Sequence, residues 1–180
     1  MGRHKTIDRD TLLDAAEAVV LREGAGNLTF EAVAKVAKVS KGGVLYAFAN
    51  KDMLIDAMLR RVVANYDRAV ETFLAINGDS PETRIHAHVE ASRNEDAEVI
   101  TRAVALMASF VRAPAFQAET TVFYKDLFAM CDTSSLAGRR LRLALLATEG
   151  AFALQGFRFY SFSDEEWQAV HNDIIDILFN

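Results

Sequence analysis

The residues best suited to chemistry gather in one segment, residues 29–51, TFEAVAKVAKVSKGGVLYAFANK. Lys41 supplies a cation at the start of an expected short helix, and Tyr46 supplies a hydroxyl donor further along it. Gly42 and Gly43 follow Lys41, and residues without side chains let a backbone approach a ligand closely. Cations, hydroxyls and free backbone N–H groups bind phosphates. The segment therefore predicts an interface for a nucleic acid.

Two short helices joined by a tight turn must position these groups. Thr29 is typical of an N-cap, and the apolar residues that follow it give a helix of about two turns a buried face. Lys38 lies in the interruption, and Ser40 can cap a second short helix. A helix-turn-helix of this kind places the start of its second helix in a major groove. We assign Phe48 to the core and Tyr46 to phosphate.

The flanking residues extend the predicted interface. Lys51 begins the next helix, for which Asn50 is a suitable cap. The basic residues of the N-terminal arm either reach phosphates or a minor groove, or they form a plain solvated terminus. The predicted DNA contacts are Thr29, Lys38, Ser40, Lys41, Gly42, Gly43, Tyr46, Lys51, Arg3 and Lys5.

Residues spread along the first fifty positions match the pattern of one family. They are Arg9, Leu12, Leu13, Ala15, Ala16, Gly24, Thr29, Val33, Ala34, Val39, Ser40, Lys41, Gly42, Tyr46, Phe48, Lys51 and Leu54. At these positions the sequence resembles the tetracycline-repressor (TetR) family of one-component regulators. The resemblance implies an all-α homodimer of nine helices, with three helices that bind a palindromic operator and the rest holding an effector pocket.

Three positions depart from that family's pattern. Lys38 stands where the family usually has the turn glycine, so either the turn holds a lysine at positive φ or its geometry differs. Leu45 takes a place often held by a tyrosine, and Ala47 takes that of a frequent histidine. These departures bear on operator affinity rather than on the fold.

Composition and periodicity independently favour helices. The chain has 180 residues, 51% of them hydrophobic and 25% charged, with only 2 prolines to punctuate the turns of a β fold. Apolar residues recur at helical spacing in nine stretches, one of which runs from residue 51 to about residue 76. We expect an all-α fold of about nine helices, with a helix-turn-helix DNA-binding domain over residues 1–51 and an effector-binding and dimerisation domain over residues 52–180.

Charge and cysteine content indicate which partners and which cellular location to expect. The formal net charge is −5, but residues 1–51 carry 8 basic and 6 acidic side chains while residues 52–180 carry 12 and 19. A basic excess of that size does not argue for DNA by itself. Cys131 is the single cysteine and cannot form an intrachain disulfide. Without a signal peptide or a spanning apolar run, we expect a cytoplasmic protein that is not in a membrane.

The second domain is rich in aromatic residues, because nine of the 12 phenylalanines lie beyond residue 100. They serve either as core or as walls of a ligand pocket. Glu149 interrupts an apolar helix, and its partner is either Arg102, Arg112, Arg158 or a ligand, which in that case would be cationic or amine-bearing. The predicted pocket residues are Met107, Phe110, Phe123, Tyr124, Phe128, Glu149, Phe152 and Gln155.

The last two helical stretches, residues 135–160 and 163–179, could form half of a four-helix dimer interface. The sequence predicts no metal or other cofactor, since His86 and His88 lie two residues apart on a helix and face different sides. The predicted interface residues are Leu145, Phe157, Trp167, Val170, Ile174 and Leu178.

Together these patterns indicate a ligand-responsive repressor, a homodimer that binds a palindromic operator and is released by a small-molecule effector. An architectural DNA-binding protein without an effector is the alternative. A helical enzyme that binds a small molecule is a weaker alternative. The sequence contains no recognisable pair of nucleophile and base, no phosphate-binding loop and no set of metal ligands.

Replacing Lys41 by alanine should weaken operator binding by roughly 1–3 kcal/mol and leave the dimer intact, because the change removes one cation from the interface. Fluorescence anisotropy with operator DNA measures the first effect, and sedimentation measures the second. Unchanged affinity would show that the recognition helix is assigned wrongly.

Overall fold

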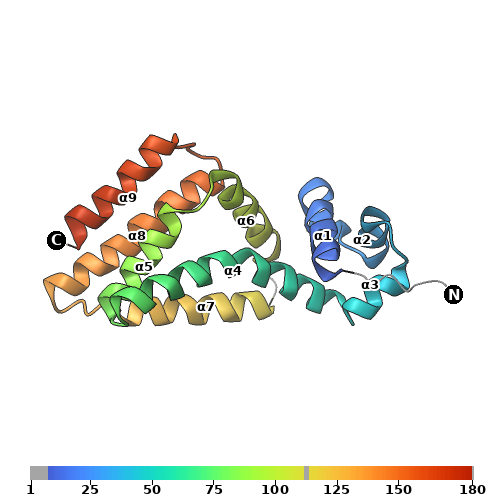
Figure 1. The fold of residues 1–180 in the computed structure, drawn as a ribbon, viewed down its shortest axis with the longest axis horizontal. Helices are drawn as coiled ribbons and strands as arrows, with labels where there is room; N and C mark the ends of the chain where they lie inside the picture. The colour runs from blue at the N-terminus through green and yellow to red at the C-terminus, as the bar shows by residue number, and fades with distance from the viewer. Residues whose placement is uncertain (1–7, 112–113, 180) are drawn as a thin grey trace. The chain divides into compact units, whose positions relative to one another are not determined.

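The computed structural model describes residues 8–111 and 114–179 (Figure 1). Across these residues the chain forms nine α-helices and one short 3-10 turn, Ala25–Asn27, and no strand. This confirms the expected all-α fold. The helices are α1 Arg9–Glu23, α2 Phe30–Ala37, α3 Lys41–Ala47, α4 Lys51–Asn77, α5 Pro81–Arg93, α6 Ala97–Phe110, α7 Pro114–Ala129, α8 Leu136–Gly156 and α9 Asp164–Leu178.

The chain divides into two compact units. The described residues of Met1–Val62 and Leu106–Phe116 form the first, which we call the head; those of Val63–Ala105 and Gln117–Asn180 form the second, the body. The head extends past the predicted boundary at residue 51, because Leu54, Met58 and Leu59 of α4 are buried in its core. The boundary predicted from the sequence followed the start of a helix and missed this packing.

Local capping explains where the head helices begin. Each of three helices is preceded by a side chain whose oxygen accepts a hydrogen bond from a backbone N–H of its first turn. Thr29 accepts from the N–H of residue 32 at 3.1 Å, Ser40 from that of residue 43 at 3.1 Å, and Asn50 from that of residue 53 at 2.8 Å. All three caps were predicted from the sequence.

The start of α4 is fixed to α1 by charge as well as by packing. The Arg61 guanidinium lies against the carboxylate of Glu17, with Nε 3.1 Å from Oε1, and its Nη1 is 2.9 Å from Oδ1 of Asp14. Glu17 is only 5% exposed. A carboxylate buried to this degree requires a positive partner, and Arg61, whose side chain is 29% exposed, supplies it from the edge of the core.

Lys38 closes the turn between α2 and α3. Its φ is 55° and its ψ is 41°, the left-handed region, and its N–H donates to the carbonyl of Ala34. The next residue also donates to that carbonyl, at 3.0 Å. Of the two alternatives left open by the sequence, the structure has the lysine at positive φ.

In the body, α5, α8 and α9 pack against one another. His171 of α9 is fully buried, with Nδ1 2.8 Å from the carbonyl oxygen of Trp167 and Nε2 3.1 Å from the Ser92 hydroxyl. Burial lowers the pKa of His171, which favours the neutral ring at pH 7. Its two nitrogens then act as donor and acceptor in the core.

Three residues predicted at a dimer interface lie in the core of the body instead. Leu145 is 0% exposed, Trp167 7% and Ile174 5%. They are buried because the apolar stripes of α8 and α9 meet α5 and each other inside one protomer. Val170 and Leu178 are partly buried there as well. Only Phe157, at 50% exposure, remains open.

The exposed apolar residues of α8 lie at other positions, which the sequence did not single out. Leu143, Leu146 and Leu154 are 41–52% exposed. They alternate along α8 with its buried residues and lie on its exposed face.

Gly138 lies in the first turn of α8, where its N–H donates to the hydroxyl of Ser135 at 3.0 Å. A Cβ at this position would lie 1.9 Å from the carbonyl oxygen of Asp132. The loop before α8 therefore passes directly over the glycine backbone, with no room for a side chain.

Replacing Lys38 by glycine should stabilise the head by about 1 kcal/mol, because glycine adopts the left-handed conformation without the Cβ clash. Urea unfolding followed by helical circular dichroism measures the change. The matched control is Lys35→Gly in the exposed interior of α2, which should destabilise by about the same amount. Destabilisation by both substitutions would contradict the turn geometry.

Candidate functional site

The predicted DNA contacts that the structure describes lie on the head, at α2, α3 and the caps beside them. Lys41 and Gly42 are exposed at the start of α3, and Tyr46 is 92% exposed. A Cβ at Gly42 would approach only the Ser40 hydroxyl, at 3.9 Å, so the surface there is open. Thr29, Lys38, Ser40 and Lys51 are also exposed, whereas Arg3 and Lys5 lie outside the described residues.

Gly43 requires a correction, because it is buried in the head and not on the open face of α3. Its N–H donates to the Ser40 hydroxyl, so its place is in the cap. Phe48 is 0% exposed, which confirms its assignment to the core. The Arg9 guanidinium lies over its ring, 4.6 Å from the centroid, and adds a cation–π contact.

Lys41 has an intramolecular partner that the sequence did not reveal. Its Nζ contacts the carboxylate of Glu31 in α2, and both side chains are more than half exposed. The hydrogen bond from Lys41 lowers the pKa of Glu31 below its ordinary value. Any phosphate that binds Lys41 must therefore compete with this carboxylate.

The body contains a polar cluster in an aromatic setting. The Tyr66 hydroxyl lies 2.6 Å from Nδ1 of His88, and Nε2 of the same ring lies 3.0 Å from a carboxylate oxygen of Glu149. The carboxylate is not in line with the ring N–H, so His88 Nε2 makes no hydrogen bond although it is buried. The Tyr124 hydroxyl also hydrogen-bonds to Glu149.

Burial, together with the negative charge of Glu149, raises the pKa values of Tyr66 and Tyr124. Both phenols therefore stay protonated at pH 7 and donate hydrogen bonds. With its proton retained, the Tyr66 hydroxyl can donate to Nδ1 of His88. Among the described residues, the contacts of Glu149 are thus His88 and Tyr124, and the predicted partner Arg112 lies outside these residues.

This cluster unites only part of the predicted effector pocket. Phe123 joins it, with its ring centroid 6.0 Å from that of Tyr66 and 5.1 Å from that of Tyr124, both edge to face. Tyr66 and His88 were not predicted as site residues. Tyr66 continues the helical spacing of Leu54, Met58 and Val62, and nothing local in the sequence shows that it meets a residue of α5.

The other predicted pocket residues lie elsewhere, which corrects that prediction. Phe110 is buried in the core of the head, and Met107 belongs to the same unit. Phe152 packs in a separate cluster of the body that contains Trp167. Gln155 lines a different cavity. Phe128 is 39% exposed.

Among the described residues, no helix combines the length and apolar character needed to cross a bilayer.

Comparison with known proteins identifies the family. Residues 82–178 match the tetracyclin repressor-like C-terminal domain, and residues 12–58 match the bacterial regulatory proteins of the tetR family. The first match alone covers more than half of the chain, so the chain belongs to the TetR family of bacterial regulatory proteins.

Individual relatives agree with this assignment. The HTH-type transcriptional regulator BetI of Stenotrophomonas maltophilia is 27% identical over 113 residues, which are 63% of this chain and 57% of the relative. BetI of Serratia proteamaculans is 30% identical over 105 residues, 58% of this chain and 52% of the relative. The chain therefore spans about half the length of the curated relatives that it matches.

Two solved structures share the fold. A transcriptional regulator from Rhodococcus sp. RHA1 has a TM-score of 0.64 at 19% identity and covers 96% of both chains. The multidrug binding protein EbrR, solved with malachite green, has a TM-score of 0.64 at 20% identity, over 94% of this chain and 97% of that one.

Replacing Glu31 by glutamine should raise the affinity of the head for duplex DNA by up to about fivefold, because Lys41 no longer has to leave a carboxylate. The slope of log affinity against log salt should steepen by about one. Anisotropy across a salt series measures both quantities.

The control substitution is Glu23→Gln, which removes an acid of the head that does not contact Lys41. A double-mutant cycle with Lys41→Ala separates the two effects of Glu31. If the gain from Glu31→Gln persists in the Lys41→Ala background, the carboxylate acts only by general repulsion of phosphates.

Proposed function

We propose that the chain is a ligand-responsive transcriptional regulator that binds a palindromic operator as a homodimer. The observation that carries the proposal is the exposed start of α3. This surface carries Lys41, Gly42 and Tyr46. The Ser40 cap and the turn at Lys38 hold the helix in place. A helix-turn-helix presents its second helix to the major groove in this way.

Dimerisation follows from the geometry of the operator. Two heads reach successive major-groove faces only when they are about 34 Å apart, one turn of B-DNA. The exposed Leu143, Leu146, Leu154 and Phe157 offer an apolar face of α8 for a second copy. Their exposure supports a dimer through α8.

The polar cluster of the body supports an effector site. Glu149 retains 28% side-chain exposure and faces aromatic rings, a setting that suits a cationic or amine-bearing molecule. EbrR, which shares the fold, has been solved with imidazole, malachite green and ethidium. We infer that this chain also responds to a small molecule, and that repression ends when the molecule binds.

A single helix can carry the response. Arg61 of α4 is held by α1 in the head, and Tyr66 of α4 belongs to the body cluster. Tyr66 follows Arg61 by five positions, a rise of about 7.5 Å along an α-helix. A shift of Tyr66 on effector binding would therefore strain the contacts of Arg61 and disturb the head.

Two other functions fit the observations less well. An architectural DNA-binding protein would not need a partly exposed carboxylate among aromatic rings. An enzyme is also less favoured, because burial raises the pKa values of the Tyr66 and Tyr124 hydroxyls and keeps them protonated, which makes them weak nucleophiles. We therefore infer a regulator rather than an enzyme, acting on DNA in the cytoplasm.

Binding to the intergenic DNA upstream of its own gene tests the proposal. By fluorescence anisotropy, we expect tight binding with two protomers per site, weakening steeply with salt as phosphate contacts release counterions. A scrambled duplex of equal length is the control, and Lys41→Ala is the matched variant. Equal affinity for both duplexes would favour the architectural alternative.

A further inference from the structure

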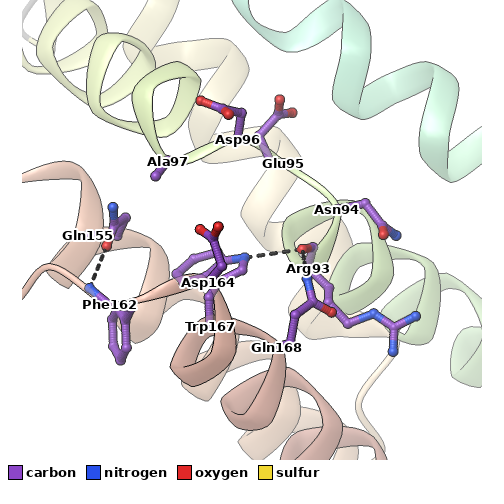
Figure 2. A pocket seen from close by; sticks show the side chains of 10 residues that line it. All are labelled: Arg93, Asn94, Glu95, Asp96, Ala97, Gln155, Phe162, Asp164, Trp167 and Gln168. Atoms are coloured by element: carbon purple, nitrogen blue, oxygen red, sulfur yellow. Dashed lines mark hydrogen bonds between the residues drawn. The ribbon is translucent and has the colours of Figure 1, made fainter.

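The body contains a second candidate site, a cavity of about 350 Å³ (Figure 2). The end of α5, the loop 94–96, the end of α8 and the start of α9 form its walls. None of the lining residues belongs to the polar cluster of Tyr66, His88, Tyr124 and Glu149. The volume falls within the range of ligand pockets, ~300–1,000 Å³.

The walls of this cavity are held by hydrogen bonds between its own residues. The carbonyl oxygen of Arg93 accepts from Nε1 of Trp167 at 3.1 Å and from Nε2 of Gln168 at 3.0 Å. On the other side, Oε1 of Gln155 accepts from the backbone N–H of Phe162 at 2.9 Å. The cavity is preorganised, so a ligand need not order it on binding.

Gln155 offers a hydrogen-bond donor on the wall. Its side chain is 7% exposed, and its oxygen accepts from the backbone N–H of Phe162. Its amide nitrogen points away from that bond (Figure 2). This nitrogen can donate to an acceptor on a bound ligand.

The cavity also has an excess of negative charge, from Glu95, Asp96 and Asp164. Asp96 caps α6, where Oδ1 accepts from the backbone N–H of residue 98 at 2.7 Å. The Asp164 carboxylate takes part in no hydrogen bond or ion pair among the described residues. Burial raises the pKa of Glu95, so its negative charge is poorly solvated.

The basic residue among those lining the cavity does not neutralise it. The Arg93 guanidinium lies 2.7 Å from Glu90 and 3.0 Å from Asn172, and points away from Trp167 and Asp164 (Figure 2). The remaining wall is aromatic: the rings of Phe162 and Trp167 pack edge to face, 5.6 Å apart. Carboxylate and aromatic face together attract cations.

We propose that this cavity binds a small organic cation with a flat apolar part. The ammonium pairs with Asp164, the flat part packs against Trp167, and a hydrogen-bond acceptor at the other end of the molecule meets the Gln155 amide. This site is separate from the Glu149 cluster. Its occupancy does not rest on DNA binding.

Tyramine is a suitable probe, since it combines an ammonium, an aromatic ring and a hydroxyl. Trp167 is the sole tryptophan of the chain, so indole fluorescence reports directly on the cavity. We expect a saturable change in wild-type fluorescence. Phenethylamine, which lacks the hydroxyl, should bind more weakly, and 3-(4-hydroxyphenyl)propionate, which carries a carboxylate in place of the ammonium, should not bind.

Asp164→Asn should raise the dissociation constant for tyramine by about tenfold or more, because it removes a charge-assisted contact. Glu165→Gln is the matched control on the same helical turn and should leave the constant unchanged. Circular dichroism checks that each variant is folded.

Three results would overturn the proposal: no saturable signal, equal binding of the carboxylate analogue, or a loss of binding in Glu165→Gln equal to that in Asp164→Asn. The analogue series on the wild-type protein decides the question even if Asp164→Asn fails to fold. Because no DNA is present, a negative result here leaves the regulator function untouched.

Discussion

The attachment of α4 to α1 is the constraint on which the head depends. Glu17 is buried in α1, and Arg61 is the cation that makes its burial tolerable. Breaking a buried pair by removing one partner costs ~3–5 kcal/mol, a large share of the ~5–15 kcal/mol that stabilises a typical domain. The apolar side chains of Leu54 and Met58 complete the attachment. The short helices α2 and α3 share the resulting core and could not form one alone.

Both candidate sites for the proposed regulator already contain a partner for their charged group. Lys41 contacts Glu31 in the head, and Glu149 contacts His88 and Tyr124 in the body. A phosphate or an effector must displace or join these internal contacts, so binding energy is a difference between two sets of interactions. Selectivity arises more readily in this way, because a weakly matched ligand does not replace the internal partner.

Local features of the fold could be predicted from the sequence, and non-local ones could not. The caps at Thr29 and Ser40 depend on residues within three positions, so their types suffice to predict them. The cluster of Tyr66, His88 and Glu149 joins three helices, and no short-range pattern indicates that meeting. Periodicity likewise showed that Leu145 and Trp167 lie on apolar stripes. It did not show whether a helix of the same chain or a second protomer covers those stripes.

Gly138 limits which substitutions the chain can accept at the start of α8. Glycine is among the weakest helix formers, so at an ordinary position in α8 replacement by alanine would be favoured by about 1 kcal/mol. Here the carbonyl of Asp132 occupies the place of a Cβ. A relative with any other residue at this position must carry a differently built connection between α7 and α8. This glycine therefore distinguishes descendants that keep the loop from those that have rebuilt it.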